Sequence, residues 1–238
     1  MLVTQEFTVE VEGNTILDDL TLEYGPGVHI VMGPNGVGKS TFAHALMGKP
    51  DYITEGAVQI NGKDLLAMEV HERAQAGLFV SFQTPTPIEG LSNYQFMRQC
   101  LKEKDITIKE SLGEFKRIAS EYGLPDQWDK KQLNVQASGG EKKKNELIQL
   151  ELLKPTVAIL DEPDSGLDVD AINTLVRRLT NYVETDDSRC LIIISHYQQL
   201  IEKLNPQTVT VFRKNGTATQ TDDISITQKI LESGFNAV

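Results

Sequence analysis

Apolar residues along the chain form short runs bounded by turn residues, and between several of these runs they recur at helical spacing. The strand-like runs cover residues 28–32, 78–82, 157–160, 191–194 and 209–212. Strands that alternate with helices are typical of a mostly parallel sheet, so the pattern predicts an α/β core. Between residues 170 and 183 the apolar positions keep helical spacing, which predicts a helix with one face buried against that sheet.

The N-terminal part has a different pattern. Residues 3–11 alternate loosely between apolar and polar, and residues 57–60 form a second short strand candidate that ends at Asn61-Gly62. Asn-Gly is a strong signal for a tight turn between antiparallel strands. We therefore expect an antiparallel β subdomain near the N-terminus.

The region from about residue 84 to residue 137 is richer in charge and helical in period, without a convincing strand. This pattern predicts a helical subdomain inserted into one domain that covers residues 1–238. Its first helix should start after Ser92, because Ser92 and Gln95 stand at the two positions of a capping box.

Composition narrows the function classes. With 238 residues, 39% hydrophobic and 24% charged, the chain can bury a sizeable core as one large α/β domain or two small ones. A formal charge of −11 argues against a protein that works by clamping nucleic-acid phosphate. The apolar runs are too short to cross a bilayer, and the N-terminus has no signal-peptide pattern. We expect a cytoplasmic protein, or one in an organelle stroma or matrix if a transit peptide was removed.

The two cysteines, Cys100 and Cys190, are far apart in sequence and outside any C-x-x-C spacing. This spacing suggests neither a disulfide framework nor a zinc or iron-sulfur site. We expect both to be buried thiols.

A phosphate-binding loop is the first chemical signal. Residues 33–40 match G-x-x-x-x-G-K-[ST] between a predicted strand and a helical stretch. Glycines let successive N–H groups point at one anion, Lys39 reaches the β and γ phosphates, and the Ser40 hydroxyl can hold Mg²⁺. With the residue that follows the octet, the predicted nucleotide-binding residues are Gly33, Pro34, Asn35, Gly36, Val37, Gly38, Lys39, Ser40 and Thr41.

Two carboxylates, Asp161 and Glu162, end the strand predicted at residues 157–160. Neighbours on a strand point to opposite sides, so the two side chains can have separate roles. We predict that Asp161 assists the metal and that Glu162 polarises the attacking water. Two solvated carboxylates at a strand end are the alternative, which the phosphate-binding loop disfavours.

A second glycine-rich turn, Ser138-Gly139-Gly140-Glu141, runs into a helix. Ser138 and Glu141 form a capping box, so a well-capped helix is the structural alternative. Two glycines at a helix start also expose N–H groups to an anion, although no lysine is placed as in the first loop. The turn is typical of half a phosphate site.

These motifs occur in an order that resembles the ATP-binding cassette (ABC) ATPases: the phosphate-binding loop, Ser138-Gly139-Gly140, Asp161-Glu162-Pro163, Ser165-Gly166-Leu167-Asp168, and Ser195-His196. The resemblance implies a P-loop NTPase fold and two ATP molecules sandwiched in a head-to-tail dimer. It implies that Ser138, Gly139 and Gly140 cover the γ-phosphate held by the other subunit, and that Asp168 crosses the dimer interface.

The same resemblance assigns two further residues. His196 would sense the γ-phosphate, although a lone histidine after a strand is more commonly structural. Gln83 would bridge the two lobes and approach Mg²⁺ and the attacking water, so the implied metal-binding residues are Ser40, Gln83 and Asp161. No tyrosine lies some two dozen residues ahead of the loop to stack on adenine; the substitutes are Phe7, Val9 or Val11.

The amino-acid sequence at residues 138–145, 161–171 and 195–198 resembles that of the ABC-type ATPases of the SUF iron-sulfur cluster assembly system. This likeness covers nearly the whole chain. It implies that ATP hydrolysis drives conformational change in a SufB/SufD-type scaffold. The ATP-hydrolysing subunit of a membrane ABC transporter is the alternative, because it shares every catalytic residue. An ATP-regulated adaptor without turnover is disfavoured, since Glu162 and His196 are both present.

The resemblance also implies a docking groove for the partner beside the first helix of the insertion, next to Gln83. We expect Ile88 and Tyr94 to be the leading contact residues. Packing of these side chains in the protein's own core is the alternative.

Overall fold

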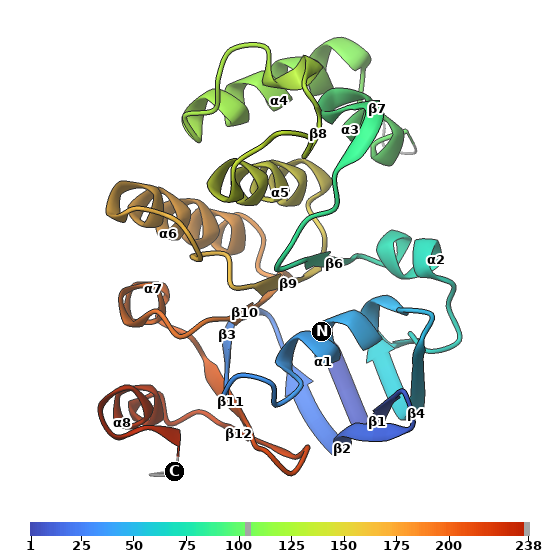
Figure 1. The fold of residues 1–238 in the computed structure, drawn as a ribbon, viewed down its shortest axis with the longest axis vertical. Helices are drawn as coiled ribbons and strands as arrows, with labels where there is room; N and C mark the ends of the chain where they lie inside the picture. Colours follow the sequence, from blue (N-terminus) through green and yellow to red (C-terminus); the bar gives the residue numbers. More distant parts are fainter. Residues whose placement is uncertain (103–105, 236–238) are drawn as a thin grey trace. The chain divides into compact units, whose positions relative to one another are not determined.

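The computed structural model describes residues 1–102 and 106–235. The chain forms two compact units, which are described separately below. Unit 1 consists of Met1–Gln83, Pro155–Asp164 and Val176–Val238, and unit 2 consists of Thr84–Lys154 and Ser165–Leu175. Figure 1 shows the elements of both units along the chain.

Unit 1 contains a six-stranded sheet in the order β12-β11-β3-β10-β9-β6. All neighbours pair in parallel except the edge strand β12, which is antiparallel to β11. The bounds are β3 Gly27–Met32, β6 Leu78–Ser81, β9 Val157–Asp161, β10 Cys190–Ile194, β11 Thr208–Phe212 and β12 Ala218–Thr221. Every residue of β3, β9 and β10 is buried, which explains their continuous apolar runs. The predicted parallel core is confirmed.

The second sheet of unit 1 is antiparallel and four-stranded, in the order β2-β1-β4-β5. Its strands are β1 Leu2–Val11, β2 Asn14–Tyr24, β4 Tyr52–Ile60 and β5 Lys63–Asp64. The expected N-terminal antiparallel subdomain and the Asn61-Gly62 turn are confirmed. The sequence did not predict β2, because its apolar alternation shifts between Leu17 and Leu20, where Asp19 has a φ of 50° and the register with β1 shifts.

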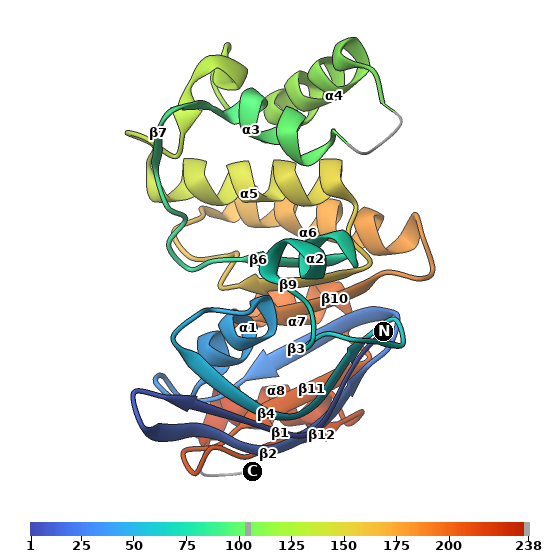
Figure 2. The same cartoon turned by 90° about the vertical axis from the view of Figure 1, so that its right-hand side faces the viewer.

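Helix α1, Lys39–Met47, lies between the two sheets, in contact with β1, β2 and β4 on one side and with β6 and β9 on the other (Figure 2). Phe42 is fully buried, and its ring lies 6.3 Å from that of Phe7, 6.4 Å from that of Tyr24 and 5.7 Å from that of Phe212. These rings join both sheets to the helix that follows the phosphate-binding loop. The other helices wholly in unit 1 are α2 Val70–Gln75, α7 Gln198–Leu204 and α8 Ser225–Ser233.

Unit 2 is mainly helical. Its elements are β7 Ile88–Ser92, α3 Asn93–Cys100, α4 Ile108–Glu121, the short 3-10 helix η1 Trp128–Lys130, β8 Gln132–Leu133 and α5 Gly139–Leu153. The first residues of α6, Val169–Glu184, also belong to it. The prediction of no strand was wrong, because β7 and β8 pair in a small antiparallel sheet. The cap at Ser92 is confirmed, since its hydroxyl accepts from the Gln95 N–H at 3.1 Å.

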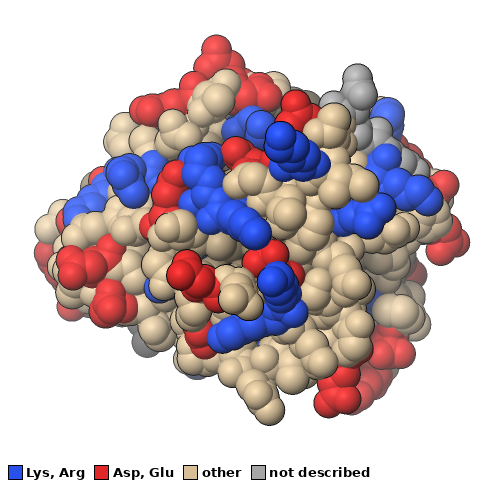
Figure 3. All heavy atoms as spheres, turned by 90° about the horizontal axis from the view of Figure 1, so that it is seen from above, with Lys and Arg blue, Asp and Glu red and all other residues tan. Residues whose placement is uncertain are grey.

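The two units differ in charge. Unit 1 carries 11 Lys and Arg against 21 Asp and Glu, whereas unit 2 carries 12 against 13. Figure 3 looks onto the side of α3 and α4, where Lys and Arg side chains are interspersed with Asp and Glu side chains. The chain's net negative charge therefore resides almost entirely in unit 1.

One expectation about a single residue, the burial of Cys100, was wrong. Cys190 is buried in β10, but Cys100 is exposed at the end of α3. The Tyr94 hydroxyl donates to the Ile108 carbonyl at 2.8 Å, and its ring packs edge-on at 6.1 Å from the ring of Phe115. Tyr94 is thus half-buried with contacts inside unit 2, whereas Ile88 is 41% exposed on β7. A contact of either residue with a partner stays a prediction.

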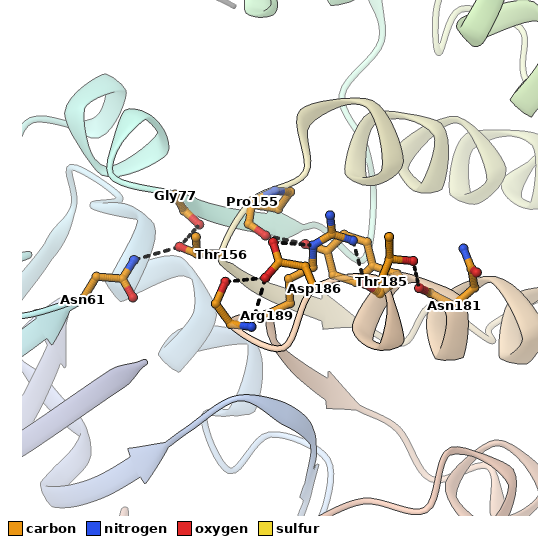
Figure 4. Close-up of polar contacts among 10 residues, drawn as sticks. Asn61, Gly77, Pro155, Thr156, Asn181, Thr185, Asp186 and Arg189 are labelled. Carbon is orange, nitrogen blue, oxygen red and sulfur yellow. Dashed lines mark hydrogen bonds and ion pairs between the residues drawn. The ribbon is translucent and has the colours of Figure 1, made fainter.

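A group of polar contacts closes the amino-terminal ends of β9 and β10 (Figure 4). The Asn61 amide donates to the Thr156 hydroxyl at 2.8 Å. The buried Arg189 guanidinium donates to the Tyr182 carbonyl at 2.6 Å and stacks over the Tyr182 ring at 4.4 Å. The motif residues Asp161 and His196 lie at or beyond the opposite, carboxyl ends of these strands, so this group stabilises the sheet away from the motifs.

Arg189→Ala should therefore destabilise unit 1 without changing nucleotide affinity. Loss of a buried charge-assisted hydrogen bond and a stacked cation should lower the free energy of unfolding by about 2 kcal/mol. Urea denaturation measures this change, and Arg177→Ala, an exposed position on α6, is the matched control. A change in Arg189→Ala no larger than in the control would contradict the role of this contact.

Candidate functional site

The phosphate-binding loop connects the carboxyl end of β3 to α1. Gly38 is the N-cap of α1 with a φ of 100°, and a Cβ there would lie 2.6 Å from the Leu17 side chain. Only glycine fits this position, because it combines a left-handed backbone with close packing. The loop therefore delivers free N–H groups at the start of α1, where the helix dipole favours an anion.

Lys39 lies within this loop rather than in solvent. It is 7% exposed, and its ammonium donates to the carbonyl of Gly33 at 2.7 Å and to that of Pro34 at 2.9 Å. Burial lowers the pKa of Lys39, whereas the carboxylates of Glu162 and Asp161 act in the opposite direction. A positive charge is thus placed among the loop N–H groups.

The other predicted loop residues differ in exposure. Asn35 and Gly36 are exposed at the tip, whereas Val37 is buried. Ser40 and Thr41 are half-buried in the first turn of α1. The Ser40 hydroxyl is therefore placed at the start of the helix, beside the lysine.

Asp161 and Glu162 are separated by a left-handed backbone conformation at Glu162 rather than by strand alternation. Strand β9 ends at Asp161, which is 2% exposed. Glu162 has a φ of 48° and donates its N–H to the Ile194 carbonyl at 2.9 Å. The prediction that both lie on one strand was wrong. A non-glycine residue in this conformation costs on the order of 1–3 kcal/mol, and such strain concentrates at functional sites.

Gln83 and His196 lie at the same edge of the sheet, after the carboxyl ends of β6 and β10. The Gln83 amide donates to the Glu162 carboxylate at 3.0 Å, across 79 residues of sequence. His196 follows β10, and within the described part of the chain its buried Nε2 has no hydrogen-bond partner. Burial and the charge of Lys39 lower the pKa of His196 below its usual value, which favours the neutral ring.

Asp164 is a residue that the sequence analysis did not single out. Its carboxylate is hydrogen-bonded to the side chain of the fully buried Ser195, whose hydroxyl also accepts from the Tyr197 N–H at 3.0 Å. Burial raises the pKa of the Asp164 carboxyl. These bonds brace the turn that carries His196. The sequence signal that could have identified Asp164 is its position as a third carboxylate directly after Asp161-Glu162-Pro163.

Unit 1 thus brings together five predicted residues from separate segments: Lys39, Gln83, Asp161, Glu162 and His196. The remaining predicted residues of the phosphate-binding loop, residues 33–41, are also in unit 1, whereas Ser138, Gly139, Gly140 and Asp168 belong to unit 2.

The Ser138 turn is the N-terminus of α5. The Ser138 hydroxyl accepts from the Glu141 N–H at 3.3 Å, and the Glu141 carboxylate accepts from the Ser138 N–H at 2.8 Å, which confirms the capping box. The latter bond lowers the pKa of Glu141. Gly139 has no positive φ, and a Cβ there would meet nothing within 4 Å. The fold of this chain does not itself require glycine at residue 139.

Asp168 caps the start of α6. Its carboxylate accepts from the Ala171 N–H at 2.8 Å, and its carbonyl accepts from the Ile172 N–H at 2.9 Å. The side chain is exposed. Asp168 thus has a local structural contact and remains accessible from outside the chain.

The structure removes two of the three candidates for adenine stacking. Phe7 and Val9 are fully buried in the core beneath the antiparallel sheet. Val11 is partly exposed, and so is Ile16, whose side chain lies 3.0 Å from a Cβ built on Gly38. Val11 remains the candidate, with Ile16 as an apolar neighbour of the loop that the sequence analysis missed.

Comparison with known proteins identifies the family. A sequence model described as "ABC transporter" matches residues 17–165. The chain is 37% identical to "Vegetative protein 296" of Bacillus subtilis (strain 168), over 99% of this chain and 92% of that protein. It is also 37% identical to "Probable ATP-dependent transporter SufC" of Escherichia coli (strain K12), over 99% of this chain and 97% of that protein. A Synechocystis protein, "Probable ATP-dependent transporter slr0075", is 40% identical over 89% of this chain and 85% of that protein.

Solved structures show the same fold. "Structure of ATP binding subunit of ABC transporter" aligns with a TM-score of 0.80 at 22% identity, covering 98% of this chain and 95% of that one. Among the helices that the structure describes, none combines the length and apolar character needed to span a bilayer. With the phosphate-binding loop and its carboxylates in place, these similarities show that the chain belongs to the ABC transporter family as an ATPase that binds and hydrolyses ATP.

Proposed function

We propose that this ATPase works as a head-to-tail dimer that drives conformational change in a SufB/SufD-type scaffold during iron-sulfur cluster assembly, in the cytoplasm or in an organelle stroma or matrix. The observation that carries the assembly role is the likeness to the Escherichia coli protein named SufC, which extends over 97% of that protein. The relatives are similar well beyond the nucleotide-binding motifs, which all ABC ATPases share.

Magnesium fits the residues of unit 1. Mg²⁺ prefers oxygen ligands and is usually bound through one or two carboxylates together with substrate phosphates. The described residues contain no group of three His, Cys, Asp or Glu that could hold a metal alone, and Ser40, Gln83 and Asp161 offer one hydroxyl, one amide and one carboxylate. We assign these three as the protein ligands of Mg²⁺, which when bound neutralises charge on the phosphates.

The remaining residues of unit 1 have distinct roles in this proposal. Lys39 and the loop N–H groups hold the β and γ phosphates. The Glu162 carboxylate orients the attacking water and accepts its proton, and Gln83 holds that carboxylate in position through the 3.0 Å bond. His196 contacts the γ-phosphate through the Nε2 atom that is buried in the described structure.

The glycine turn supports a site shared between two chains. Gly139 is not required by backbone conformation or packing, and the turn is an exposed helix N-terminus. A phosphate from a second copy that approaches this backbone would explain both glycines, because a side chain would keep the anion away. We infer that Ser138, Gly139 and Gly140 close the ATP site of the partner copy and that Asp168 contacts that copy.

The second candidate function is the ATP-hydrolysing subunit of a membrane transporter. The matched family is described as "ABC transporter", and a solved exporter, "Structure of a bacterial Atm1-family ABC exporter with ATP bound", shares the fold with a TM-score of 0.76 at 20% identity. Its catalytic residues would be the same. Only the physical partner distinguishes the two functions.

An affinity-tagged copy of the chain in its native cell should therefore capture a soluble SufB/SufD-type scaffold in the presence of ATP. Mass spectrometry of the captured soluble and detergent-solubilised fractions identifies the partner. Adding the purified scaffold should raise the steady-state rate of phosphate release. Capture of a multi-span membrane protein instead, with no scaffold, would favour the transporter function. Ile88, exposed on β7, remains our candidate contact with the scaffold.

A further inference from the structure

Four side chains form a buried polar network inside unit 2. Asn93 and Asn145 are each 1% exposed, Trp128 is 2% exposed and Asn134 is 5% exposed. The Asn145 amide oxygen accepts from the Trp128 indole N–H at 2.9 Å. The Asn145 amide nitrogen donates to the Asn93 oxygen at 3.0 Å and to the Asn134 oxygen at 3.3 Å. Asn145 is therefore the centre of the network.

The network connects segments that are distant in sequence. The Asn93 amide donates to the Trp128 carbonyl at 3.0 Å, and the Asn93 N–H donates to the Lys131 carbonyl at 2.9 Å. The start of α3 is thereby tied to η1, while Asn145 ties both to α5.

Asn134 extends the network to the segment that follows Gln83. Its amide nitrogen donates to the Thr86 carbonyl at 3.1 Å, three residues beyond Gln83. Its backbone is left-handed, with a φ of 58°, directly after β8 and four residues before Ser138. One side chain thus connects the segment after Gln83, the loop that leads to Ser138 and the helix that begins there.

Helix α5 connects Asn145 to the glycine turn, so the hydrogen bonds of Asn145 also restrain the position of that turn. Asn145 lies seven residues after Ser138, about two helical turns along the same face. Because a helix is stiff over this length, a shift at Asn145 would move the Ser138 turn with it. Buried amides specify one arrangement more strictly than apolar contacts, because each lost hydrogen bond leaves an unsatisfied buried group.

We propose that Asn134 and Asn145 are positioning residues for the Ser138-Gly139-Gly140 turn, which they hold in place for the phosphate of the second copy. This inference rests on the proposed action of that turn across a dimer. Neither residue touches the nucleotide. Their effect should appear in the rate of hydrolysis and not in nucleotide binding by the single chain.

Asn134→Gly is the test variant, because glycine adopts a φ of 58° without strain while both side-chain hydrogen bonds are lost. We expect kcat for ATP hydrolysis to fall about tenfold, since small misplacements of groups around a reacting centre have effects of this size or more. Nucleotide affinity of the isolated chain should stay within twofold of wild type. Gln136→Gly is the matched control: the residue is exposed, lies in the same loop and has a φ of 53°.

Two results would overturn the inference: a kcat for Asn134→Gly within twofold of Gln136→Gly, or an equal loss of nucleotide affinity in the isolated chain. Trp128→Phe provides a second measurement if Asn134→Gly does not fold. It removes the indole N–H that Asn145 accepts, together with part of the buried ring, so kcat should fall at least about threefold, the size expected for loss of one neutral hydrogen bond. An unchanged kcat in Trp128→Phe would also count against the inference.

Ser138→Arg, measured in parallel, separates this inference from the proposed function. If Ser138→Arg hydrolyses ATP normally, the shared site itself is wrong. If Ser138→Arg is inactive while Asn134→Gly behaves like Gln136→Gly, only the positioning role is wrong.

Discussion

Glu162→Gln should lower steady-state ATP hydrolysis by about 10²–10⁴-fold, because a positioned general base contributes that much and an amide cannot accept the proton. Glutamine has nearly the same shape, and its amide oxygen can still accept from Gln83. Lys39 and the loop N–H groups remain, so ATP binding should persist. A steady-state phosphate-release assay measures the rate, and size-exclusion chromatography with ATP should show the variant accumulating as an ATP-bound dimer.

Glu184→Gln is the charge-matched control, since Glu184 is exposed at the end of α6. It should hydrolyse ATP like wild type. Turnover by Glu162→Gln that stays close to the control would show that another group activates the water. Loss of nucleotide binding in Glu162→Gln would instead mean that the carboxylate belongs to the binding site.

Ser138→Arg should abolish hydrolysis while the isolated chain still binds nucleotide. Ser138 is an exposed N-cap, so the arginine side chain would occupy the space in which a second copy presents its γ-phosphate. Loss of the cap alone costs about 1 kcal/mol of stability. Ser138→Ala loses the same cap without the added bulk and should retain more of the activity, which separates obstruction from helix destabilisation.

Mixing two inactive chains tests the shared site directly. A heterodimer of Ser138→Arg and Lys39→Ala contains one site with both an intact Lys39 and an intact Ser138. Phosphate release from the mixture should therefore exceed the sum of the two chains measured alone. No gain on mixing, together with a fall in single-chain nucleotide affinity for Ser138→Arg as large as its loss of activity, would rule out action across a dimer.

Several elements could be predicted from the sequence because their signals are local. Strands β3, β9 and β10 are buried on both faces, so they are continuous apolar runs. The caps at Ser92 and Ser138 depend only on residues three apart. The spacing of glycines and Lys39 in the phosphate-binding loop is likewise contained in eight consecutive residues, 33–40.

Other features could not be predicted because they depend on distant contacts. Strand β2 was missed because the irregularity at Asp19 breaks its alternation, and that irregularity exists only in the pairing with β1. The exposure of Cys100 and the contact of Tyr94 with Ser111 follow from how the helices of unit 2 pack. The small β7 and β8 sheet joins segments some forty residues apart, which no local pattern reveals.

By itself, the sequence determined which chemical groups the protein has: a phosphate-binding loop, a strand that ends in carboxylates, and a second glycine turn. Only the tertiary structure decided which of them meet. The strand order β3-β10-β9-β6 places the carboxyl ends of four strands side by side, and these ends carry Lys39, His196, Glu162 and Gln83. The left-handed conformation of Glu162 and its bond to Gln83 exist only in that arrangement, because parallel neighbours are brought together by long crossovers.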